Sequence, residues 1–201
     1  MRGFRLIEPE EMVKRNDIVW DFRRFFAHGY GFEEVGLPSV CERTMFEGKT
    51  KDNRLWDFKD KGGRDVCLAP EGTAILQEQW ENHWSKTQKS KRVLYISDFF
   101  RYERPQRGRY RQFTQLGVEV FGEDNLNIEA LLQRFLDSFK GLSYEFNNNV
   151  DRGWSYYRKG KGFEASVPSL GAQKQIAGGG QYSNGKGFAI GLDRLILAVA
   201  Q

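Results

Sequence analysis

Five arginines lie within eleven residues near the middle of the chain, between Arg101 and Arg111, and Glu103 lies among them. Arginine carries a permanent charge on a planar fork that fits phosphate oxygens, so several arginines on one loop could hold a polyphosphate in an extended or bent shape. The same composition is typical of a solvated basic turn or of a nucleic-acid-binding patch. Charge therefore predicts a cationic loop without separating these three interpretations.

The residues after the arginines have the pattern of a β-strand. Every second residue from Phe113 to Glu119, including Gln115 and Gly117, falls on one face if the backbone is extended. Gly108, inside the arginine run, gives the chain the freedom to turn. We expect two strands joined by a cationic loop.

This run closely resembles motif 2 of the class II aminoacyl-tRNA synthetases, in the form found in histidyl-tRNA synthetases. The resemblance is carried by Arg101-x-Glu103 and by the run Gly108-Arg109-Tyr110-Arg111-Gln112-Phe113. Members of that family build an antiparallel sheet flanked by helices and condense histidine with ATP. The resemblance therefore implies an α+β fold of the class II synthetase type, with residues 1–201 as a single catalytic domain.

Four other segments extend the resemblance over nearly the whole chain. Residues 187–198 are similar to motif 3, and residues 150–157 to the Val-Arg-Gly-Leu-Asp-Tyr-Tyr signature of histidyl-tRNA synthetases. Residues 178–183 resemble their Ala-Gly-Gly-Arg-Tyr-Asp element, and residues 69–73 their Arg-Pro-Glu-Gly-Thr loop. The chain departs from these patterns at positions near the amino-acid site, which keeps a different amino acid open: Ala69, Trp154, Ser155, Gln181 and Ser183.

The resemblance implies a role for the residue at each matching position. Adenylation brings a carboxylate against the α-phosphate of ATP, so the site must supply fixed cations where negative charge grows. The catalytic cations would be Arg101, Arg152 and Arg194. ATP would be bound by Arg101, Glu103, Arg109, Phe113 and Arg194, with Mg²⁺ bridging its phosphate oxygens; no protein ligand of Mg²⁺ is predicted. Histidine would be bound by Glu71, Thr73, Gln115, Glu119, Tyr157 and Tyr182.

Without the family, these segments have simpler structural interpretations. Residues 70–73 are typical of a capped turn, with Thr73 as the helix cap. An arginine followed by tyrosines, as at Arg152 and Tyr157, is typical of a solvated strand face with aromatic cross-strand pairs. The glycines that begin at Gly178 permit close approach of the backbone to a flat ligand, although a glycine run alone is a weak signal.

The remaining segments predict the frame that positions these residues. Apolar residues at helical spacing predict helices over residues 8–28, 74–84 and 127–139. Extended segments are expected at 32–35, 37–40, 93–96 and 163–167, a hairpin at 56–68, and turns at 147–149 and 169–171. The first helix with the proline-ended strand after it resembles motif 1, the dimer interface of class II synthetases, which implies a homodimer.

Composition limits the class of protein. A chain of 201 residues can bury a core without disulfides, and a net charge of +4 with 14% aromatic residues suits a globular protein with polyanionic partners. The two cysteines, Cys41 and Cys67, lack the spacing of a zinc site or a disulfide framework. The N-terminus lacks a signal pattern and no apolar run reaches a membrane span, so we expect a soluble, cytoplasmic protein.

The resemblance also implies that two parts of a full histidyl-tRNA synthetase are missing. The stretch between Gly122 and Val150 is too short for the helical insertion that the family usually carries. The sequence stops after the segment that resembles motif 3, so no anticodon-binding domain is expected either. A minimal catalytic core is therefore predicted.

Three functions remain open. The first is an enzyme that forms histidyl-adenylate and transfers the histidyl group to the acceptor end of tRNA or to another acceptor. The second is a non-catalytic histidine-binding paralogue similar to the regulatory subunit of ATP phosphoribosyltransferase, and the third is an adenylating enzyme for another amino acid or acceptor. A histidine sensor has no need for Arg101, Arg109 and Arg194 together, so their presence favours an enzyme.

Overall fold

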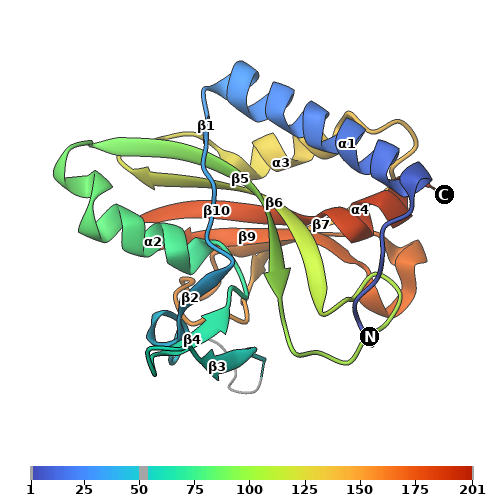
Figure 1. The fold of residues 1–201 in the computed structure, drawn as a ribbon. Helices are drawn as coiled ribbons and strands as arrows, with labels where there is room; N and C mark the ends of the chain where they lie inside the picture. The colour runs from blue at the N-terminus through green and yellow to red at the C-terminus, as the bar shows by residue number, and fades with distance from the viewer. Residues whose placement is uncertain (1, 50–53, 201) are drawn as a thin grey trace.

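The computed structural model describes residues 2–49 and 54–200, and its centre is a seven-stranded sheet in the order β1-β5-β6-β10-β9-β8-β7 (Figure 1). β1 runs parallel to β5, and every other neighbouring pair is antiparallel. The predicted antiparallel sheet is therefore confirmed, with one parallel edge strand. The strands are β1 (Glu33–Glu34), β5 (Ser90–Phe100), β6 (Gln112–Gly122), β7 (Glu145–Val150), β8 (Gly162–Ser166), β9 (Gln175–Tyr182) and β10 (Gly185–Gly191).

The central hairpin is formed by β5 and β6, as the spacing in the sequence predicts. The two strands pair without interruption from Ser90 opposite Gly122 to Phe100 opposite Gln112. The cationic loop between them turns back through a bridge between Gln106 and Arg109, and Gly108 inside that turn has a φ of 72°, which favours glycine. The expected pair of strands with an arginine-rich loop is confirmed.

One face of the sheet is covered by helices α1 (Pro9–Arg23), α3 (Ile128–Asp137) and α4 (Leu192–Val199). The predicted first helix continues from α1 through a π-helical turn, η1 (Arg24–His28), so its predicted extent is confirmed. α3 starts where Asn127 Oδ1 accepts a hydrogen bond from Ala130 N at 3.0 Å. Phe22, Phe26 and Phe135 pack against one another in this core with centroids 4.7 to 5.6 Å apart.

The other face holds helix α2 (Thr73–Asn82) and a small three-stranded sheet. Trp80 of α2 stacks on Phe121 of the large sheet at 5.5 Å. The small sheet has the order β2-β4-β3, so the predicted hairpin is confirmed and gains a third strand. Short helices η2 (Arg43–Phe46), η3 (Trp84–Lys86) and η4 (Pro168–Gln173) complete the fold, and the small strands are β2 (Val40–Glu42), β3 (Asp57–Lys59) and β4 (Asp65–Leu68).

The two cysteines lie opposite each other in this small sheet. Cys41 of β2 pairs in register with Cys67 of β4, and both are buried free thiols. In the parts of the chain that the structure describes, no helix is both long and apolar enough to cross a membrane.

The turn predicted at residues 147–149 is wrong. These three asparagines lie in β7 at the edge of the large sheet, where they pair with β8. Their side chains are exposed, and a solvated edge strand tolerates polar residues that would be costly in a central strand. The turn character survives only at Asn149, whose φ is 59° and which forms a bulge between Asn148 and Val150.

Alternation along β6 separates the two faces of the sheet. Leu116, Val118 and Val120 pack under the helices, whereas Gly117 faces the other side, against the ring of Tyr95. A Cβ at this glycine would lie 2.1 Å from Tyr95 Cζ. Glycine is therefore required here for packing.

Gly117→Ala is expected to lower the free energy of unfolding by about 1–3 kcal/mol, because the extra methyl group overpacks a closed site. Urea unfolding measures the change. Gly36→Ala is the matched control, since nothing lies within 4 Å of its added Cβ and its φ is outside the left-handed region. Equal unfolding midpoints for the two variants would contradict the packing argument.

Candidate active site

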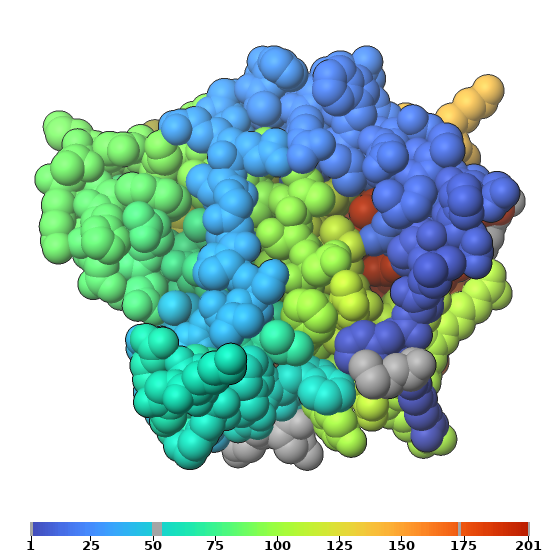
Figure 2. All heavy atoms as spheres, in the orientation of Figure 1, coloured from blue at the N-terminus to red at the C-terminus, as the bar shows by residue number. Residues whose placement is uncertain are grey.

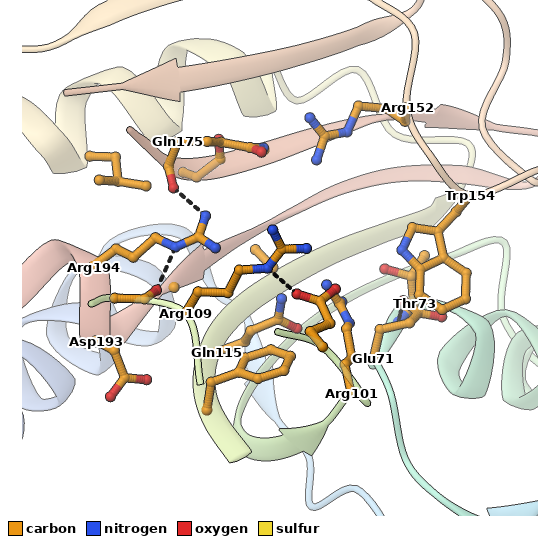
Figure 3. Close-up of a pocket in the computed structure, with 18 of the residues that line it drawn as sticks. Glu71, Thr73, Arg101, Arg109, Gln115, Arg152, Trp154, Gln175, Asp193 and Arg194 are labelled. Atoms are coloured by element: carbon orange, nitrogen blue, oxygen red, sulfur yellow. Dashed lines mark hydrogen bonds and ion pairs between the residues drawn. The ribbon is translucent and has the colours of Figure 1, made fainter. Parts of the chain in front are cut away.

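Four arginines from separate segments line one pocket on the α2 side of the sheet (Figure 3). Arg101 follows β5, Arg109 lies in the cationic loop, Arg152 follows β7, and Arg194 is in the first turn of α4. The sequence interpretation depended on their convergence, and the structure brings them together. Of the other predicted site residues, those that line the pocket are Glu71, Thr73, Glu103, Phe113, Gln115 and Tyr157.

Arg101 is fixed in the pocket wall. Its Nε donates to the carbonyl oxygen of Pro70 at 2.8 Å, and its guanidinium lies 5.0 Å from the ring of Phe113 and 5.6 Å from the ring of Trp154. Burial lowers the pKa of Arg101, although a guanidinium remains charged throughout the physiological range. The site thus holds a permanent, largely desolvated cation between two aromatic rings.

Arg109 and Glu103, both predicted to contact ATP, form an ion pair with each other. Arg54 adds a longer contact to the same carboxylate, at 3.7 Å. Burial alone would raise the pKa of Glu103, but the hydrogen bond from Arg109 and the charge of Arg101 outweigh it and lower that pKa. The pair holds the Arg109 guanidinium at the pocket, and Figure 3 marks this contact with the dashed line that starts at Arg109.

Arg194 is held by the backbone of two distant segments. Its Nε donates to Gly108 O at 2.8 Å and its Nη1 to Gln175 O at 2.7 Å. Burial, and after it the positive charges of Arg109 and Arg101, lowers the pKa of Arg194. The cations are therefore close enough to repel one another, which favours an anion between them.

The residue before Arg194 has a different task. Asp193 points away from the four pocket arginines in Figure 3. Its carboxylate instead accepts hydrogen bonds from Arg15 Nη1 at 3.0 Å and from Arg5 Nη2 at 2.8 Å. Arg15 belongs to α1 and Arg5 to the N-terminal segment, so Asp193 ties both to the start of α4. The same segment supports the cationic loop, because Gly3 O accepts from Arg111 N at 2.8 Å, and Figure 2 shows these dark blue residues against the yellow-green loop.

Glu119 is buried behind the pocket wall. Its Oε1 accepts a hydrogen bond from Thr73 Oγ1 at 2.6 Å and its Oε2 one from the hydroxyl of Tyr182 at 2.5 Å. Burial raises the pKa of the Glu119 carboxyl to about 8. A Cβ at Gly187 would lie 1.6 Å from Oε2, so this glycine makes room for the carboxylate. Glu119 and Tyr182 are thus joined to the pocket through Thr73.

Glu71 caps α2. Its carboxylate accepts from Thr73 N and Ala74 N, both at 2.8 Å, and from the Tyr156 hydroxyl at 2.9 Å. Burial raises the pKa of Glu71. The sequence predicted a capped turn with Thr73 as the cap; the turn exists, but the cap is Glu71, and the Thr73 hydroxyl is directed to Glu119 instead.

Comparison with known proteins identifies the family. Residues 3–139 match the family model described as histidyl-tRNA synthetase. The chain belongs to the histidyl-tRNA synthetase family. It is 40% identical over 143 residues to the histidine–tRNA ligase of Pyrococcus abyssi, a match that takes in 69% of this chain and 33% of the relative. The match thus spans about a third of the length of this relative and of the histidine–tRNA ligase of Pyrococcus furiosus.

Two further matches extend over the whole chain. The histidine–tRNA ligase of Methanospirillum hungatei is 28% identical over 308 residues, which cover all of this chain and 75% of that relative. The relative thus carries residues within the matched span that this histidyl-tRNA synthetase family member lacks, consistent with the predicted missing insertion. The solved structure of apo Staphylococcus aureus histidyl-tRNA synthetase superimposes with a TM-score of 0.79 at 26% identity, covering 100% of this chain and 69% of that one.

In this member of the histidyl-tRNA synthetase family, the signature segment around Arg152 forms a loop. Residues 151–161 contain no strand, and both Arg152 and Tyr157 line the pocket. The interpretation of this segment as a solvated strand face is therefore wrong. In a strand, Arg152 and Tyr157 would point to opposite faces, because they are an odd number of residues apart. The irregular backbone of the loop lets both side chains face the pocket.

The glycines of β9 have a packing role that the sequence did not reveal. A Cβ at Gly178 would lie 2.5 Å from Arg152 Nη2, and one at Gly162 of β8 would lie 2.7 Å from Arg152 Cγ. A Cβ at Gly180 would lie 2.9 Å from Tyr157 Cδ1. The sequence suggested close approach to a flat ligand, but these glycines admit the protein's own arginine and tyrosine.

The pocket residues that were not predicted to be functional include Trp154, Tyr156 and Gln175. Trp154 and Tyr156 lie within the family signature, and their rings stack on each other at 5.9 Å, so an aromatic run beside Arg152 was an available signal. Gln175 precedes the glycine run and carries no local signal. It contacts two of the arginines only because of the way β9 enters the sheet.

The carboxylates of the pocket do not fit a magnesium ion held by the protein. Among the described residues, no three His, Cys, Asp or Glu side chains are grouped as metal ligands. Glu103 is paired with Arg109, and Asp193 with Arg5 and Arg15. Magnesium would therefore enter the site bound to the phosphates of the nucleotide substrate.

The raised pKa of Glu119 predicts how stability depends on pH. Between about pH 4.5 and 8 the folded protein keeps a proton on Glu119 that the unfolded chain has lost, so the contribution of this group to the free energy of unfolding falls as the pH rises. Glu119→Gln removes the titration. We expect urea-unfolding midpoints of this variant to decline less from about pH 5 to 8 than those of the parent protein. Parallel declines would contradict the prediction.

Proposed function

We propose that this chain activates histidine with ATP, forming histidyl-adenylate and pyrophosphate, and transfers the histidyl group to an acceptor, with tRNA as the first candidate. The observation that carries the proposal is the convergence of four arginines on one pocket, next to the buried Glu119 and Tyr182. Relatives named histidine–tRNA ligase support the choice of amino acid and acceptor.

The arginines supply what the adenylation step needs. A carboxylate oxygen of histidine attacks the α-phosphorus, a new O–P bond forms, and the bond to the β-phosphate oxygen breaks so that pyrophosphate leaves with the electron pair. Arg101 would hold the α-phosphate, and Arg152 would neutralise the charge that grows on it. Arg109 and Arg194 would hold the outer phosphates of a bent, magnesium-bound ATP.

Glu103 and Phe113 would bind the adenine base. In the proposal Phe113 stacks on the ring, and Glu103 contacts the exocyclic amino group. Arg109 is already positioned by its ion pair with Glu103, so it can exchange part of that contact for phosphate oxygens without reorganising the loop. The same cationic hairpin would then bind both the adenine base and the phosphates of ATP.

Histidine would lie between α2 and β6. Glu71 and Thr73 would accept its ammonium group, and Gln115 and Tyr157 would line its side-chain pocket. Glu119, with Tyr182, would accept the imidazole N–H, which favours the carboxylate form. Histidine binding would therefore release the proton that burial keeps on Glu119.

Two alternatives remain from other classes of protein. A non-catalytic histidine-binding paralogue would need the amino-acid pocket but no set of phosphate-binding arginines. An adenylating enzyme for another amino acid or acceptor would be consistent with the departures from the family pattern at Ala69, Ser155, Gln181 and Ser183. The retained arginines favour the first function over the sensor.

Exchange of labelled pyrophosphate into ATP, measured with each amino acid in turn, distinguishes the proposed function from these two alternatives. Exchange that depends on histidine is the expected result. Histidine binding without exchange would identify the sensor, and exchange that depends on a different amino acid would identify the third function. A charging assay with tRNA then tests the acceptor.

We also propose a cytoplasmic homodimer, in line with the family. α1 supports the dimer because Val13 and Trp20 are 61% and 63% exposed on its surface. Trp20→Glu is expected to convert the dimer to a monomer, since a charge placed in an apolar interface is costly. Sedimentation velocity measures this, with exposed Lys14→Glu on the same helix as control. A parent protein that sediments as a monomer would overturn the dimer.

A further inference from the structure

Gln175, the first residue of β9, touches two of the four pocket arginines. Its backbone carbonyl accepts from Arg194 Nη1 at 2.7 Å. Its side-chain amide faces Arg152, and because a guanidinium only donates, the amide oxygen is the atom turned toward it, accepting from Nη1 and Nη2 at 3.0 Å each. Figure 3 shows Gln175 between the two guanidinium groups.

We propose that Gln175 is a positioning residue that holds Arg152 and Arg194 at a set separation across the site. The inference deepens the proposed adenylation and rests on it. Gln175 does not touch the reacting atoms in this proposal. It acts through the two arginines, one by its side chain and the other by its main chain.

Arg152 depends on this amide because its surroundings offer little else. Its other acceptor in the described part of the chain is Glu164 Oε2, at 3.5 Å, and its Nε is buried without a partner there. The aliphatic part of the side chain lies against the backbone of Gly162, and the guanidinium lies against the backbone of Gly178. The two glycines allow the guanidinium to lie close to the sheet, but they offer it no side-chain acceptor. The orientation of the guanidinium therefore depends on the Gln175 amide.

The chemical nature of the acceptor matters as well. A neutral amide orients a guanidinium without cancelling its charge, whereas a carboxylate at the same place would form an ion pair. The amide therefore adds no second negative charge to the Glu164 carboxylate, which lies 3.5 Å from Arg152 Nη1, and Arg152 can still attract a phosphate. An amide at this position therefore suits a cation that must stay available to an anionic ligand.

The backbone brings Gln175 to this place through an irregularity in the sheet. Ala165 of β8 pairs with Ala177, but the next residue, Ser166, pairs with Gln175, so Ile176 is an extra residue in β9. A bulge of this kind changes the direction of a side chain at the end of a strand. Here it turns the Gln175 amide toward Arg152 while its carbonyl still reaches Arg194.

Kinetic constants for histidine-dependent pyrophosphate exchange test the inference. Gln175→Ala and the near-isosteric Gln175→Met both remove the acceptor, and each is expected to lower kcat on the order of 10- to 100-fold. The KM for ATP should stay within about twofold, because Arg194 keeps its backbone acceptor. Gln175→Glu restores an acceptor but neutralises the cation, so it should lower kcat and also raise the KM for ATP.

Lys174→Ala, at the exposed neighbouring position, is the control and should match the parent protein. A Gln175→Met variant with parental kcat would overturn the inference, because the amide would then only fill space. Equal losses in kcat and in apparent ATP affinity, together with a lower unfolding midpoint, would also overturn it in favour of a general structural role.

A second measurement does not depend on activity. Arg152 side-chain NMR signals, assigned by their loss in Arg152→Lys, should report restricted rotation of the guanidinium in the parent protein and in Gln175→Glu, and averaging in Gln175→Ala. Identical signals in all three would overturn the inference. If the parent protein supports no exchange with any amino acid, the adenylation proposal fails, and the NMR result still decides whether Gln175 orients Arg152.

Discussion

Arg152→Ala is expected to lower the kcat of histidine-dependent pyrophosphate exchange by about 10²- to 10³-fold, the loss typical when one fixed donor to a transition state is removed. Arg152 lines the pocket from a loop, and its carboxylate partner among the described residues is Glu164, whose Oε2 lies 3.5 Å from Arg152 Nη1. Its interaction with phosphate would strengthen as charge develops, so the KM for ATP should change by no more than about threefold.

Arg152→Lys separates charge from geometry in the same assay. Lysine retains the charge but loses the planar fork, so an intermediate kcat is expected. Arg158→Ala is the matched control, because Arg158 belongs to the same loop, is exposed and lies outside the pocket. If Arg152→Ala and Arg158→Ala were equally active, Arg152 would not be the cation that serves the reaction.

Glu119→Gln is expected to lower kcat/KM for histidine by about 10²- to 10³-fold, with the KM for ATP unchanged. A site built around a buried hydrogen-bonding group discriminates strongly when that group no longer matches its ligand. The substitution preserves the shape and can still bond to Thr73 and Tyr182, but it removes the negative charge that would bind the imidazole N–H. The substitution should therefore weaken the use of histidine and leave the binding of ATP unchanged.

Calorimetry in buffers of different ionisation enthalpy gives a second measure of the same group. The parent protein should release about one proton on binding histidine near neutral pH, because the Glu119 carboxyl, with a pKa of about 8, becomes ionised. Glu119→Gln should release none, and Glu123→Gln, an exposed glutamate after β6, should behave as the parent protein. Undiminished histidine selectivity in Glu119→Gln would place the recognition of the side chain elsewhere.

Local pattern was sufficient for much of the site. The period of two from Phe113 to Glu119 identified a strand and one of its faces, because side chains alternate along any extended backbone. Helical spacing located α1, α2 and α3 to within a few residues for a similar reason. The arginine-rich hairpin and the later motifs indicated the family, and the convergence of their arginines followed from the fold that the family implies.

Only the tertiary structure decided which groups bond to which. The Asn147–Asn149 segment became a strand because β8 was beside it, and the Glu71 carboxylate caps α2 while the Thr73 hydroxyl bonds to Glu119. Gln175 reaches Arg152 and Arg194 through a bulge in the pairing of β8 with β9. Residue type and spacing determine which conformation a short segment prefers, but partners distant in sequence are set by strand register and packing, which a local pattern does not contain.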